Sequence, residues 1–61
     1  MNERDCYTVD AMEKWGGGFI KALANLARHA DPTNLERLKA NWPNYWAEYE
    51  KMGFDLEKEE K

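Results

Sequence analysis

The segment from Asp10 to Glu36 reads DAMEKWGGGFIKALANLARHADPTNLE, within a chain of 61 residues. Its large apolar residues recur every three or four positions, which is the spacing of one face of an amphipathic α-helix. Asp10 and Glu13 have the spacing of a capping box, so we expect this helix to begin near Asp10. The apolar face of the predicted helix consists of Met12, Trp15, Phe19, Leu23, Leu26 and Ala30.

Three consecutive glycines, Gly16, Gly17 and Gly18, interrupt this predicted helix. A glycine in a helix interior costs about 1 kcal/mol relative to alanine, so the run needs a compensating reason. Either another backbone packs closely against the glycines, or the helix breaks and restarts at Phe19. A phosphate-binding loop would need a preceding strand and a different spacing of glycines. The sequence allows the first two explanations, and we take close helix packing as the prediction.

Two further helices are expected after the first. Asp31 followed by Pro32 is typical of an N-cap residue and a proline in the first helical turn, so a helix begins between residues 31 and 34. Pro43 ends or kinks that helix and can start a third, after which Gly53 is suited to the position just past a helix end. The prediction is an all-α fold, an antiparallel helical hairpin with a proline-kinked second arm, with helices at about 10–30, 32–42 and 43–52.

The chain is expected to contain one helical domain, residues 10–53, between an N-terminal segment, 1–9, and an acidic, frayed tail, 54–61. Residues 1–47 carry six acids and six bases, whereas residues 48–61 carry six acids and three bases, which accounts for the net charge of −3. Such an end is either simply solvated or an acidic surface for a basic partner. The chain lacks the basic surface that phosphate-backbone binding requires, which argues against a nucleic-acid partner.

Composition argues against several other classes of protein. No apolar run approaches the ~18 residues that span a bilayer, and no signal peptide begins the chain, so we expect a cytoplasmic protein with no membrane association. The single cysteine, Cys6, excludes an internal disulfide, and with one histidine it excludes a conventional zinc site. We therefore predict no metal and no cofactor.

Catalytic groups are few. His29 lies two residues from Asp31, which could orient its imidazole, but a histidine at the end of a helix is favoured simply by the carbonyls there. Cys6 has no neighbour in the sequence that would activate its thiol. A domain of this size also lacks the depth for a cleft that excludes water. We predict that the chain is not an enzyme.

Aromatic residues are the most informative feature of the sequence. They can fill an ordinary small core, or part of them can remain outside the monomer and form an interface, where Trp and Tyr contribute most energy. A hairpin with a kinked second arm cannot enclose both faces of its first helix, so we expect homo-oligomerisation, as a two-fold dimer. The predicted interface or partner-binding residues are Trp15, Phe19, Trp42, Tyr45, Trp46 and Tyr49.

The part of the chain from Trp15 to Tyr49 resembles a group of small uncharacterised helical proteins encoded by bacteriophages and other mobile elements. The residues that carry the resemblance are Trp15-Gly16-x-x-Phe19-x-x-Ala22-Leu23, Ala30-Asp31-x-x-Asn34-x-x-x-Leu38 and Trp42-Pro43-x-Tyr45-Trp46-x-x-Tyr49. The resemblance implies a shared helical fold and a phage or mobile-element accessory protein in a bacterial cytoplasm. Proteins of this kind often bind a host protein.

Three functional hypotheses follow. The first is a non-enzymatic interaction protein that self-associates and binds a host or phage protein. The second is an oligomer whose inter-subunit pockets, lined by aromatic residues and Arg28 or Arg37, sequester a small nucleotide-type ligand. The third and weakest is a helix-turn-helix, because its recognition helix would present Glu48 and Glu50 with only Lys51 to DNA.

Overall fold

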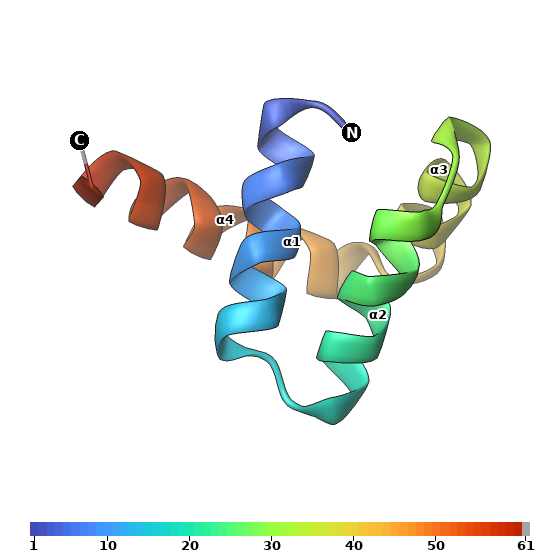
Figure 1. Cartoon of the computed structure of the whole chain (residues 1–61), viewed down its shortest axis with the longest axis horizontal. Coiled ribbons are helices and arrows are strands. Elements are labelled where there is room, and N and C mark those ends of the chain that lie inside the picture. Colours follow the sequence, from blue (N-terminus) through green and yellow to red (C-terminus); the bar gives the residue numbers. More distant parts are fainter. Residues whose placement is uncertain (61) are drawn as a thin grey trace.

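A computed structural model describes the backbone of residues 1–60 and the side chains of residues 1–56. The described chain forms four helices without a strand: α1 (Glu3–Trp15), α2 (Gly18–His29), α3 (Pro32–Asn41) and α4 (Pro43–Glu60). In Figure 1, α4 passes behind α1, while α2 and α3 lie together on one side of this crossing. The predicted all-α class is confirmed over the described residues, whereas the predicted number of three helices is wrong.

The first helix begins at Glu3 instead of near Asp10. Asn2 is its N-cap, and the Asn2 side-chain oxygen accepts a hydrogen bond from the Asp5 backbone N–H at 2.8 Å. Asp5, Thr8 and Val9 are buried, so much of the predicted N-terminal segment, 1–9, belongs to the packed domain.

The glycine run separates α1 from α2, so the predicted continuous helix at 10–30 is wrong and the alternative of a break is right. The Gly16 N–H closes α1 by donating to the Met12 carbonyl at 2.9 Å, and Gly17 is the N-cap of α2. A Cβ atom at Gly17 or Gly18 would meet nothing within 4 Å, so the predicted close helix packing is absent at these two glycines. At Gly16 a Cβ would overlap only nearby atoms of Met12 and Ile20.

The close helix crossing lies at Gly53, which is buried inside α4 and does not follow its end. A Cβ atom here would overlap the carbonyl group of Tyr7, so the α4 backbone lies directly against the α1 backbone. The predicted third helix, 43–52, is therefore too short, since α4 continues to Glu60. The tail predicted to be frayed covers residues 54–61. The side chains after residue 56 and the whole of Lys61 lie outside the described residues.

The turn between α2 and α3 agrees with the prediction. Asp31 is the N-cap of α3 and its carboxylate accepts a hydrogen bond from the Asn34 N–H at 2.8 Å, with Pro32 in the first turn. Trp42 ends α3 and Pro43 starts α4, so the proline does divide the second arm. A single hydrophobic core receives side chains from all four helices: Val9, Met12, Ile20, Leu23, Ala24, Ala27, Leu35, Leu38 and Trp46.

Gly53→Ala is expected to lower the free energy of unfolding by about 1–3 kcal/mol, because the added methyl group must push α4 away from the Tyr7 backbone. Gly18→Ala is the matched control, since its methyl group enters open space and alanine favours helix. Chemical denaturation followed by circular dichroism measures both. Equal stability of the two variants would show that α1 and α4 do not touch at Gly53.

Candidate interaction surface

An exposed cluster of aromatic rings joins the start of α2 to the junction of α3 and α4. The Phe19 ring lies 6.1 Å from that of Trp42, edge to face, and 5.9 Å from that of Tyr45. Leu26 lines a shallow hollow with Phe19 and Trp42. Exposure is high, at 57% for Phe19, 54% for Leu26 and 43% for Tyr45, whereas Trp42 is half-buried against the core. We call these four residues, Phe19, Leu26, Trp42 and Tyr45, the aromatic face.

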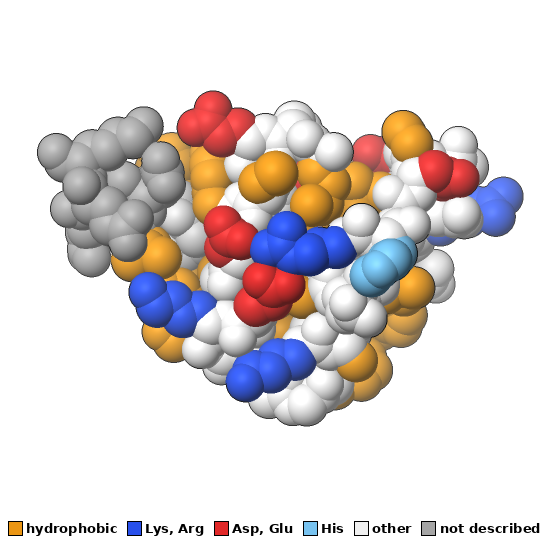
Figure 2. Space-filling view, in the orientation of Figure 1, with side chains coloured by type: hydrophobic (Ala, Val, Ile, Leu, Met, Phe, Trp, Pro, Cys, Tyr) orange, Lys and Arg blue, Asp and Glu red, His pale blue; other side chains and the backbone are white. Residues whose placement is uncertain are grey.

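The aromatic face exists because the apolar side of α2 is wider than the part of it that enters the core. Ile20, Leu23 and Ala27 are buried in the core, whereas Phe19 and Leu26, two helical turns apart, remain exposed. Figure 2 shows hydrophobic side chains over α2 along the lower right edge, below the histidine. The apolar side of an amphipathic helix normally faces the core, so the exposure of Phe19 and Leu26 means that the described chain covers this side of α2 only in part.

The structure brings together three of the six predicted interface residues: Phe19, Trp42 and Tyr45. Trp46 is only 6% exposed and belongs to the core, and Tyr49 is half-buried against that core. Trp15 is exposed at the end of α1, where it lines a separate hollow with Met52 and Leu56 of α4. Leu26 belongs to the aromatic face but was not among the predicted interface residues; like Phe19, it lies on the apolar face that the sequence predicted for the first helix.

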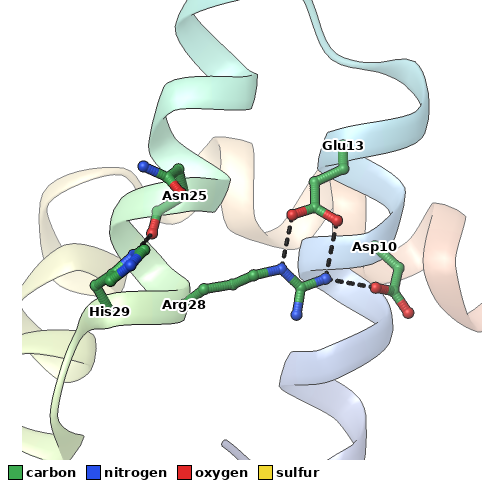
Figure 3. A network of polar contacts seen from close by, with 5 residues as sticks. All are labelled: Asp10, Glu13, Asn25, Arg28 and His29. Carbon is green, nitrogen blue, oxygen red and sulfur yellow. Dashed lines mark hydrogen bonds and ion pairs between the residues drawn. The ribbon is translucent and has the colours of Figure 1, made fainter.

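Arg28 connects α2 to α1 through two carboxylates (Figure 3). Its guanidinium donates to Glu13 at 2.6 and 2.8 Å and to Asp10 at 2.7 Å. Hydrogen bonds from Arg28 lower the pKa of Glu13, and those same bonds raise the pKa of Arg28. Asp10 and Glu13 thus bind the guanidinium of Arg28 on a neighbouring helix and do not form the predicted capping box. Arg28, one of the two arginines considered for a nucleotide-type ligand, is therefore paired with two carboxylates of its own chain.

A second ion pair connects α1 to α3 in a more buried place. The Lys39 amine lies 2.8 Å from the carboxylate of Asp5, whose side chain is 6% exposed. The same amine lies 5.3 Å from the centre of the Trp46 ring, in a cation–π geometry. The pair and the indole ring together fix α3 against the α1–α4 crossing.

Cys6 lies on α1 and His29 at the end of α2, and neither belongs to the aromatic face. Cys6 is an exposed free thiol, and the His29 ring N–H at Nδ1 donates to the Asn25 carbonyl at 2.8 Å (Figure 3). Within the described residues, no three His, Cys, Asp or Glu side chains gather as a metal site would require. No helix of the described chain has the length and apolar character to cross a membrane.

Comparison with known proteins adds no relative. No family model, no curated protein and no solved structure matches this chain.

Glu13→Gln is expected to lower the free energy of unfolding by up to about 1 kcal/mol at neutral pH, because the Arg28 pairs are exposed and screened by water. Since the pKa of Glu13 is lowered in the folded protein, its contribution is complete above its ordinary value of 4.5 and is lost as the pH falls through the lowered pKa. The stability difference between the native protein and Glu13→Gln should therefore shrink in acid.

Urea denaturation between pH 2 and pH 7 measures this difference. Glu48→Gln, at an exposed position of α4, is the matched control and should show no such change. A Glu13→Gln effect that stays constant across this pH range would contradict the role of the charged pair.

Proposed function

We propose that this chain is a non-enzymatic interaction protein that self-associates as a two-fold dimer through the aromatic face. The observation that carries the proposal is the contact of the Phe19 ring with those of Trp42 and Tyr45 on the outside of the monomer. Burial of apolar surface contributes about 25 cal/mol per Å². Clustered aromatic anchors with no charged residue among them are typical of the centre of an interface.

The size of the chain supports a second copy as the partner. A standard interface buries about 800 Å² on each side, which is about a fifth of the 4254 Å² surface of this chain. A domain this small gains much of its stability from such burial. Because a two-fold contact places the same patch on both subunits, one aromatic face suffices for the dimer. The Phe19 ring of each subunit would pack between rings of the other.

A phage or mobile-element accessory role in a bacterial cytoplasm is part of the same proposal. Its support is the resemblance carried by residues 15–49, together with the shortage of catalytic groups in the sequence. In this role the dimer binds a host or phage protein. The exposed hollow formed by Trp15, Met52 and Leu56 is then the surface that remains for that protein.

Phe19→Ser is expected to weaken self-association by about tenfold or more, because it removes the ring that contacts both Trp42 and Tyr45. Sedimentation equilibrium should give twice the chain mass of 7.2 kDa for the native protein and a shift toward the monomer for the variant. Circular dichroism should show unchanged helix content, since Phe19 is largely exposed in the monomer.

Phe54→Ser is the matched control, because Phe54 is 47% exposed and contacts Tyr7 away from the aromatic face. It should associate as the native protein does. A native protein that sediments as a monomer at all concentrations, or equal weakening by both substitutions, would contradict the proposed dimer.

A further inference from the structure

A groove lies between the end of α2 and the length of α3. Its volume is about 310 Å³, near the lower end of the range for small-molecule sites. Leu26, Ala30, Leu38 and Trp42 give it an apolar lining, and His29, Asn34, Arg37 and Asn41 give it a polar one. This mixture of one apolar wall and a few polar groups is typical of a site for a small amphipathic ligand.

The groove has positive charge and no acidic side chain in its lining. Arg37 forms no ion pair within the described residues, in contrast to Arg28, which pairs with two carboxylates. The acidic residues at the start of α3 and beside Arg37 interact with other groups. Asp31 caps the Asn34 N–H, and Glu36 lies 3.8 Å from the Lys39 amine and lines a different hollow with Asp5.

Two other polar side chains of the groove are held in place by the backbone. Asn41 donates its side-chain amide to the Arg37 carbonyl at 2.8 Å, and His29 donates Nδ1–H to the Asn25 carbonyl at 2.8 Å. Their positions are therefore set before any ligand arrives, and the Arg37 guanidinium keeps its five N–H donors for a ligand. A carboxylate or phosphate group would form charge-assisted, bidentate hydrogen bonds with it.

We infer that this groove binds an aromatic organic anion, whose ring packs against Leu26, Leu38 and Trp42 and whose carboxylate or phosphate binds Arg37. The volume suits one ring system with a short acidic side chain. The groove shares Leu26 and Trp42 with the aromatic face, so the ligand and a second copy of the chain compete for these two side chains, whereas Asn34, Arg37, Leu38 and Asn41 line the groove outside that face.

Titration of ¹⁵N-labelled protein with indole-3-acetate, followed by amide chemical shifts, tests the inference. We expect the largest shifts at Asn34, Arg37, Leu38 and Asn41. Tryptamine has the same ring with a cationic side chain and should bind at least about tenfold more weakly. Adenosine monophosphate, which has a phosphate group in place of the carboxylate, is titrated in the same way. Shifts of the same amides also support the inference and show that the groove binds phosphates.

Arg37→Gln should weaken the binding of indole-3-acetate by about tenfold or more, and Arg37→Lys should restore part of the affinity. Arg4→Gln is the matched control, since Arg4 is exposed on α1 and does not line the groove. Folding of each variant is checked in the same amide spectra. Equal binding of tryptamine, shifts confined to other parts of the chain, or unchanged affinity in Arg37→Gln with folded spectra would overturn the inference.

Discussion

The contact between Gly53 and the backbone of Tyr7 determines how α1 lies across α4. Without a side chain at Gly53 the two helix backbones can touch, and Phe54 then meets the Tyr7 ring at 6.4 Å. At this crossing Asp5 reaches Lys39 of α3. Farther along α1, the carboxylates of Asp10 and Glu13 face Arg28 of α2. The crossing thus places the acidic side chains of α1 opposite the cations of its two neighbours.

The aromatic face follows from the same arrangement. Because α1 covers one part of the apolar side of α2, Ile20, Leu23 and Ala27 enter the core, whereas Phe19 and Leu26 at the edge of that side stay exposed. The proline at position 43 turns the chain so that Trp42 and Tyr45 meet Phe19 at this exposed edge. Exposed aromatic rings in a small domain are the physical basis of the proposed self-association.

Local signals in the sequence were sufficient to predict the turns between α2, α3 and α4, and they were insufficient to predict the crossing of α1 and α4. Asp31 with Pro32, and Pro43, act through their own backbone, so their positions predicted the helix boundaries correctly. A glycine such as Gly53 can follow the end of a helix or lie inside a helix at a close crossing, and its sequence neighbours do not distinguish these two positions. Only the contact with Tyr7, which is distant in the sequence, shows that Gly53 lies at a crossing. The start of α1 was missed because its buried positions include Asp5 and Thr8, which hide the apolar period. The Asn2 cap is the signal that could have located it.

The same limit applies to the candidate surface. Aromatic content predicted an interface, but which rings are exposed depends on where α1 lies, so Trp46 entered the core and Leu26 did not. Asp10 and Glu13 are three residues apart. This spacing is that of a capping box, and it is equally that of two carboxylates on one helix face, which here bind Arg28. Only the neighbouring helix decides between these interpretations.

Isotope-filtered nuclear Overhauser spectroscopy on a mixture of labelled and unlabelled chains shows whether a second copy covers the aromatic face. A dimer formed through the aromatic face gives intermolecular contacts from the Phe19 ring to Trp42, Tyr45 or Leu26 of the other subunit. Intermolecular contacts confined to Trp15 and Phe54, or none at a concentration where the mass is that of a dimer, would contradict it.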